Sequence, residues 1–202
     1  MTTMTIPPFD PLAEAIAAVE GWPEATEATG APQAEPGPAT DGTVRTKDIL
    51  IIDYSGDLEK VWATMILAST SAAMGVRTRV FVTFWGLQVF VKDSKRITGE
   101  NWMQKMLSVM QRPGISHRKL SKMNFLGMGP WMMGSLAKRY GVASPKELLE
   151  AAQALGVEFI PCQMTMDMFG LKPEDMIEGM GEPAGAATVI GLMTDNSTPL
   201  FI

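Results

Sequence analysis

Two short apolar segments on either side of a helical one constrain the fold most strongly. The first, ILIIDYS (49 to 55), is a continuous apolar run of the kind found in strands that are buried on both faces. A helix from 57 to 74 follows, opened by Asp57 and closed by Gly75. The second segment, RTRVFVTF (77 to 84), is rich in β-branched and aromatic residues. A strand, a helix and a second strand predict a parallel β-α-β unit, and therefore an α/β fold.

A second unit of this kind surrounds the only cysteine of the chain, Cys162. Ser144 and the proline after it predict the start of a helix over 145 to 155. The run VEFIP (157 to 161) predicts a strand, and its proline, which lacks a backbone N–H, predicts that strand pairing ends there. Cys162 then precedes a short helical segment, 164 to 169. Ligands collect at the carboxyl ends of such strands, so this is where function is expected.

The position of Cys162 allows two interpretations. A thiol at the start of a helix lies near the positive end of the helix dipole, which stabilises the thiolate and favours reactivity. A lone cysteine is also commonly a small buried apolar side chain whose chemistry is not used. Exposure and pKa decide between the two. Ser55 to Asp57 and Trp85 should reach the same edge of the sheet as Cys162, because each of these segments follows a strand.

The remaining core segments carry weaker signals. Helices are expected at Trp102 to Met110, at 130 to 141, at Lys172 to Glu178 and at 186 to 194, and the final TPLFI suits a short strand. The segment from 88 to 124 is predicted to be an insertion that lies over the edge of the sheet. It includes a basic region from Lys92 to Lys122, which suits an acidic partner or an anionic substrate, although such a run is often only a solvated face.

The chain divides at residue 46. Residues 1 to 46 hold seven acidic residues and one arginine, with a short helix predicted after Asp10 and then a Pro-, Ala-, Thr- and Glu-rich stretch that is expected to be disordered. That helix would have one apolar face, which is equally consistent with a docking helix and with a frayed tail. The face is formed by Phe9, Leu12, Ile16 and Val19. Residues 47 to 202 form the folded domain, which is nearly neutral.

Composition excludes several classes of function. One cysteine allows no intrachain disulfide, and no signal peptide or long uncharged apolar stretch is present, so we expect a cytoplasmic protein without a stable membrane span. No nucleic-acid recognition motif occurs, so no nucleic-acid partner is expected. The 17 methionines with a single histidine indicate flexible core filling and no metal site. No cofactor motif is found, since neither glycine-rich stretch follows a strand.

Five segments together resemble the DsrE/DsrF-like family, and in particular its larger branch that is often labelled peroxiredoxin-like. They are YSGDLEK with the helix after it, FVTFWGL, KLSKMNFLGMGPWMM, PCQMTMD and the terminal PLFI, and the similarity spans about 48 to 202. The resemblance implies a flavodoxin-like three-layer α/β/α domain with a mostly parallel sheet. It also implies a homo- or hetero-oligomer, and for this chain we expect a homo-oligomer, as a trimer or a hexamer.

The resemblance further implies a sulfurtransferase role in sulfur trafficking or oxidation. Cys162 matches the family's persulfide-carrying cysteine, and sulfur would arrive from a TusA-like or rhodanese-like carrier protein. One thiol suffices for this chemistry when the partner provides the other. We expect the pocket around Cys162 to be shaped by Asp57, Trp85 and Met166, and an anionic persulfide to be favoured by Arg118, Lys119 and Lys122.

Two alternatives remain open at this point. A peroxiredoxin-like thiol protein is less suited to the sequence, because a lone cysteine needs an external thiol to resolve its sulfenic acid. A non-catalytic binding or scaffold module would leave Cys162 structural. Such a module predicts a thiol pKa near or above about 8.5 and slow alkylation.

Overall fold

The structure is a computed structural model that describes residues 48–95, 98–122, 124–194 and 197–202. Four strands form one sheet in the order β3-β2-β1-β4, and every neighbouring pair is parallel. The strands are β1 (Asp48–Asp53), β2 (Thr78–Val82), β3 (Glu158–Pro161) and β4 (Ser197–Phe201). The expected mostly parallel sheet is therefore confirmed.

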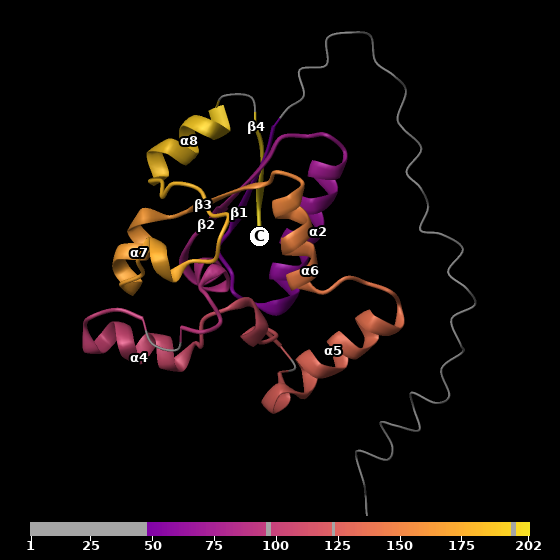
Figure 1. The fold of residues 1–202 in the computed structure, drawn as a ribbon, viewed down its shortest axis with the longest axis vertical. Helices are drawn as coiled ribbons and strands as arrows, with labels where there is room; N and C mark the ends of the chain where they lie inside the picture. Colours follow the sequence, from indigo (N-terminus) through magenta and orange to yellow (C-terminus); the bar gives the residue numbers. More distant parts are fainter. Residues whose placement is uncertain (1–47, 96–97, 123, 195–196) are drawn as a thin grey trace, which may run out of the picture. The chain divides into compact units, whose positions relative to one another are not determined.

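Helices lie on both faces of this sheet (Figure 1). On one face α2 and α6 pack side by side over a large apolar cluster, and on the other face α8 covers a smaller one. The domain is thus a flavodoxin-like three-layer α/β/α fold, as expected. Its helices are α2 (Leu58–Ala73), α3 (Phe84–Leu87), α4 (Trp102–Met110), α5 (Met128–Arg139), α6 (Pro145–Ala154), α7 (Gln163–Phe169) and α8 (Ala186–Thr194).

The β1-α2-β2 unit forms as the sequence predicts. The last four residues of β1 and all of β2 are buried, which explains why both read as uninterrupted apolar runs. Asp57 is the N-cap of α2, and Gly75 follows the helix in the left-handed conformation with φ of 78°. The register pairs Asp53 with Val82 and Val82 with Pro161, so β1, β2 and β3 end at the same level.

The segment between β2 and α5 packs against the carboxyl edge of the sheet, as expected of the insertion. The backbone N–H of Leu58 donates to the carbonyl of Lys119 at 2.8 Å, and Gly114 donates to Gln88 at 2.9 Å. The side-chain amide of Gln104 in α4 donates to the carbonyls of Asp167 and Met168 at the end of α7. Two separate parts of this segment are therefore anchored to the elements at the edge, and the bond between Gly114 and Gln88 holds the segment together internally.

A capped helix leads into the Cys162 strand. The hydroxyl of Ser144 accepts a hydrogen bond from the backbone of Glu147, and the carboxylate of Glu147 accepts from the backbone of Ser144, which forms a capping box on α6. The end of β3 is as expected. Pro161 is its last residue, and Val82 with Pro161 is the last pair of the register with β2. The N–H of Cys162 donates to Val82 at 2.9 Å, and the carbonyl of Pro161 accepts from Ala184.

The last part of the chain departs from one expectation. The helix expected over Lys172 to Glu178 is limited to a 3₁₀ turn, Pro173–Asp175. Met176 instead forms an antiparallel bridge with Val91, and the N–H of Ile177 donates to Phe90. Long-range backbone pairing is therefore preferred here to local helix formation. The helix at 186 to 194 and the final strand are as expected.

Two further expectations can be placed only in part. The boundary at residue 46 and the N-terminal helix lie outside the described residues. Within the described ranges, no helix has both the length and the apolar character needed to cross a membrane.

Candidate functional site

Three segments meet at the carboxyl edge of the sheet. After β1, the carbonyl of Tyr54 accepts a hydrogen bond from the N–H of Gly86 at 3.1 Å. Gly56 lies so close to the carbonyl of Trp85 that a Cβ at this position would be 2.7 Å from that oxygen. After β2, the N–H of Phe84 donates to the hydroxyl of Thr165, which is in α7 beyond Cys162. The convergence expected from the strand ends is therefore present.

Cys162 occupies the junction of β3 and α7. It is the N-cap residue of α7, and its carbonyl accepts the first hydrogen bond of that helix, from Met166 at 3.0 Å. Its side chain is 5% exposed and belongs to the apolar cluster under α8, together with Ile160 and Val189. The thiol thus lies on the α8 face of the sheet and is shielded from solvent.

The surroundings of the thiol act on its pKa in opposite directions. Burial raises the pKa of Cys162, but hydrogen bonding from the hydroxyls of Thr165 and Thr83, and from the backbone of Thr165 and Met164, lowers it. The net effect is a thiol pKa below its ordinary value. Hydrogen-bond donors that favour the charged form explain this direction, because they replace the water that burial removes.

Thr83 and Thr165 form the polar neighbourhood of the thiol. Their hydroxyl oxygens are 3.1 Å apart, and both residues are buried. Neither residue is predicted from the sequence. A signal for Thr165 was present, since a hydroxyl three residues after a helix N-cap is positioned to interact with the cap. Thr83 follows β2 directly and is 82 residues away from Thr165 in the chain, so only the fold brings them together.

Trp85 and Met166 have different environments. The ring of Trp85 in α3 stacks on Phe169 of α7 with centroids 5.3 Å apart, and this residue is 37% exposed. Met166 is almost fully buried in the large apolar cluster under α2 and α6. Trp85 therefore lies on the surface beside α7, whereas Met166 packs in the core beneath it.

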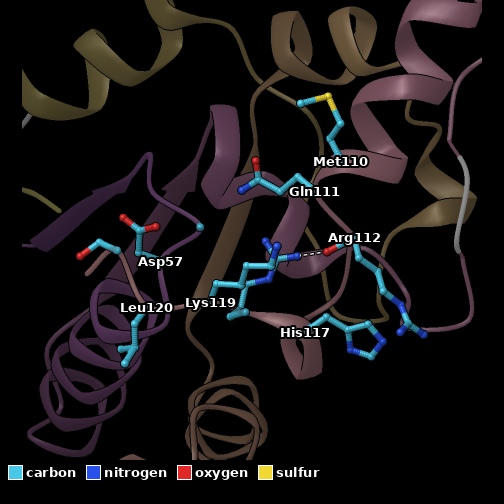
Figure 2. Close-up of a pocket in the computed structure, with 10 residues that line it drawn as sticks. Asp57, Met110, Gln111, Arg112, His117, Lys119 and Leu120 are labelled. Atoms are coloured by element: carbon cyan, nitrogen blue, oxygen red, sulfur yellow. Dashed lines mark hydrogen bonds between the residues drawn. The ribbon is translucent and has the colours of Figure 1, made fainter. Parts of the chain in front are cut away.

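Asp57, Arg118 and Lys119 line one pocket of about 280 Å³ beside the N-terminus of α2. In the close-up, Asp57 lies on one side of the pocket, and Arg112 and His117 lie on the other (Figure 2). Asp57 accepts a hydrogen bond from Lys60 at 3.0 Å. Lys122 is exposed and is not part of the lining.

The basic pocket and the thiol lie on opposite faces of the sheet. The pocket is attached to α2, through the Leu58 to Lys119 hydrogen bond and through Ser121, which donates to Glu59. Cys162 faces α8, and β2 separates its strand from β1, which places the two strand ends roughly 10 Å apart. The structure therefore groups Asp57, Arg118 and Lys119 together and leaves Cys162 outside this group.

A second buried ionisable group lies at the same edge. Asp53 ends β1, is fully buried, and accepts a hydrogen bond from the backbone of Ser55 at 3.2 Å. Burial raises its pKa to about 7, against smaller lowering effects of hydrogen bonding from Ser55 and Thr64 and of the charge on Lys60. The sequence signal for this site is an acidic residue at the end of an apolar strand.

Metal binding has no support within the described ranges. There, no three residues of the His, Cys, Asp and Glu types lie close enough together to hold an ion.

Comparison with known proteins identifies the family. Residues 45–201 match the profile of the DsrE/DsrF/DrsH-like family. The chain belongs to this family. Among family relatives, the chain is 35% identical over 160 residues to the uncharacterized protein YrkE of Bacillus subtilis, which covers 79% of this chain and 99% of that protein.

A second relative carries a functional name. The chain is 35% identical over 159 residues to the sulfur carrier protein DsrE2 of Allochromatium vinosum, which covers 77% of this chain and 98% of that protein. Among solved structures, the ychN protein of E. coli is similar with a TM-score of 0.44 and 12% identity, over 77% of this chain and 99% of that one. The DsrE-like assignment associates this chain with sulfur trafficking.

Proposed function

We propose that this DsrE-like protein is a persulfide-carrying sulfurtransferase in which Cys162 accepts and passes on sulfane sulfur. The observation that carries the proposal is the Cys162 thiol at the carboxyl edge of the sheet, whose pKa is held below its ordinary value by buried hydrogen-bond donors. A lower pKa gives more thiolate at neutral pH, and the thiolate is the nucleophile. The 35% identity to a named sulfur carrier supports the same function.

The transfer needs no second cysteine in the chain. The Cys162 thiolate attacks the outer sulfur of a carrier persulfide, R–S–SH, so that a new S–S bond forms and the S–S bond of the carrier breaks. The products are Cys162–S–SH and the carrier thiolate. In the forward step, an acceptor thiolate attacks the outer sulfur on Cys162 and releases the Cys162 thiolate. TusA-like and rhodanese-like proteins are the proposed carriers.

Access to the thiol is proposed to come from movement of α8. Among the described residues of α8, only Val189 is buried, and the exposed Ile190 lies next to it. A helix with so few buried contacts opens at low cost compared with global unfolding. Movement of this helix uncovers Cys162 without breaking the hydrogen bonds between β1, β2 and β3. Trp85, beside α7, is proposed to be part of the surface that the carrier meets.

The transfer is tested with a carrier that has been persulfidated before mixing. Intact masses of both proteins should show one sulfur leaving the carrier and arriving on the wild-type chain, whereas Cys162→Ser should leave the carrier loaded. A carrier that carries only its thiol is the matched control. Loss of sulfur from the carrier at the same rate with both chains would overturn the proposal.

The burial of Cys162 favours one competing function, a non-catalytic binding or scaffold module. In that case the apolar cluster keeps the thiol unreactive, and alkylation at pH 6 is as slow in the native protein as for an ordinary buried cysteine. Alkylation at pH 6 that is faster than for a free thiol peptide supports the carrier function. Alkylation slower than for the peptide at every pH up to 8 supports the binding module.

A further inference from the structure

The pocket beside the N-terminus of α2 is separate from the Cys162 site, and its lining is unusual in charge. Of the described residues that line it, Arg112, Arg118 and Lys119 are cationic and Asp57 is the one carboxylate. That carboxylate already accepts hydrogen bonds from Lys60 and from the hydroxyl of Ser55, both at 3.0 Å. The pocket therefore has an excess of positive charge that its own acidic residue does not neutralise.

Arg118 is the fixed element of the pocket. It is 6% exposed, its Nε donates to the carbonyl of Gly114 at 2.9 Å, and its Nη2 donates to the carbonyl of Arg112. These two backbone acceptors hold the guanidinium in one orientation. An arginine held in this way needs little further ordering when it binds a ligand.

The third nitrogen of this guanidinium makes no hydrogen bond within the part of the chain that the structure describes. Nη1 has no hydrogen-bond partner among the described residues, and it lies where a Cβ on Gly56 would approach it to 3.0 Å. Buried polar nitrogens almost always have a partner, so an orphaned one beside a pocket indicates a ligand. Nε2 of His117, which also lines the pocket, has no partner in the described part of the chain either.

The charge of Arg118 persists despite its burial. Burial lowers the pKa of Arg118 to about 10, while the negative charges of Asp93 and Asp57 raise it. The guanidinium therefore stays protonated at neutral pH. The N-terminus of α2, a helix of 16 residues, adds the positive end of its dipole to the same place.

We propose that this pocket binds a tetrahedral oxoanion, held by the fixed guanidinium of Arg118 and by the flexible cations of Arg112 and Lys119 at its mouth. The shared chemistry is a tetrahedral sulfur or phosphorus centre that carries at least three oxygen atoms, which is found either in a small sulfur oxoanion such as thiosulfate or sulfate, or in a phosphate ester. The volume of about 280 Å³ accommodates the free anion or the anionic end of a larger molecule. The proposal does not depend on persulfide chemistry, since Cys162 is on the other face.

The test is a binding titration by calorimetry on the full-length chain, at constant ionic strength maintained with chloride. The probes are thiosulfate, sulfate, inorganic phosphate and phenyl phosphate. Saturable binding is expected for at least one of them, and the preferred probe tells whether the source is a sulfur oxoanion or a phosphate ester. The same titration on Cys162→Ser should give the same affinity, which keeps this proposal distinguishable from the function of the thiol.

Variants locate the site. Arg118→Met should weaken binding by about tenfold or more, because hydrogen bonds to charged groups are the strong ones, and Arg118→Lys should recover part of the affinity. Arg112→Gln/Lys119→Gln changes only exposed side chains, so it tests the site even if the Arg118 variants fold poorly. Lys105→Gln/Arg139→Gln removes the same two charges at exposed positions outside the pocket and is the matched control.

Two results would overturn the proposal. One is the absence of saturable binding of every probe to the wild-type chain at concentrations up to about 10 mM, which corresponds to less than about 3 kcal/mol of binding free energy. The other is an equal loss of affinity in the pocket double variant and in the matched control. An equal loss would mean that net charge alone attracts the anion.

Discussion

Replacing Thr165 by valine tests the electrostatic account of the Cys162 thiol. Valine keeps the shape of threonine but removes the hydroxyl, which is one of the groups that lower the pKa of Cys162. Thr165 is fully buried, so no water takes the place of the hydroxyl. The pKa of Cys162 should therefore rise in this variant, and its alkylation at pH 6 should be slower.

The size of the effect follows from the contacts of the hydroxyl. A hydrogen bond to a charged group stabilises it by about 1.5 to 3 kcal/mol, and the lower end applies here because Thr165 also interacts with Thr83 and with the N–H of Phe84. About 1.4 kcal/mol corresponds to roughly tenfold less thiolate at a pH below the pKa. The more basic thiolate is more nucleophilic, with a Brønsted coefficient of about 0.4 to 0.5, so the net rate falls about threefold.

The assay is the pH dependence of the alkylation rate between pH 5 and pH 9, followed by intact mass. Thr165→Ser is the matched control, because it keeps the hydroxyl and should retain a profile close to that of the wild type. The valine variant also leaves the part-buried N–H of Phe84 without its acceptor, so its stability should fall by about 1 kcal/mol. An unchanged or lower thiol pKa in the valine variant would refute the reasoning.

Two further predictions concern stability and assembly. Asp53 has a pKa of about 7 in the folded state, above the ordinary 3.8, so the folded state binds this proton more tightly and the free energy of unfolding falls as pH rises from about 4 to about 7. The loss in the free energy of unfolding is roughly 4 kcal/mol. In urea titrations at several pH values, Asp53→Asn should show little of this pH dependence. An equally steep pH dependence in the variant would contradict the prediction. No described side chain of α5 is buried, and its exposed residues include Trp131 and Leu136. We therefore propose that α5 is covered by another subunit in a homo-oligomer, a trimer or a hexamer. Sedimentation should show this assembly, and Trp131→Glu should weaken it. A clean monomer at micromolar concentration would exclude the proposal.

Local signals in the sequence were sufficient for most elements of the domain. The apolar run of β1, the capping box at Ser144 and the proline after it, and the glycine at 75 each determine their structure through neighbouring residues. The position of Cys162 at the end of a strand followed from the same signals. These elements were predictable because local preference and the final fold agree at each of them.

Long-range contacts decide the features that could not be predicted from the sequence. Met176 and Ile177 leave the helical pattern because the backbone near Phe90 and Val91 pairs with them. The hydroxyl pair beside the thiol joins two residues that are 82 positions apart. The separation of Arg118 from Cys162 depends on how the segment between β2 and α5 packs against α2, and on the sheet face from which Cys162 projects.

The central claim is that Cys162 holds a sulfane sulfur, and the intact mass of the protein after treatment with polysulfide tests it most directly. Because Cys162 is the only cysteine, the wild-type chain should gain about 32 Da, one sulfur atom, and should lose it again on reduction with dithiothreitol. Cys162→Ala should gain nothing under the same conditions. A wild-type chain that gains no mass, or a variant that gains as much as the wild type, would contradict the account.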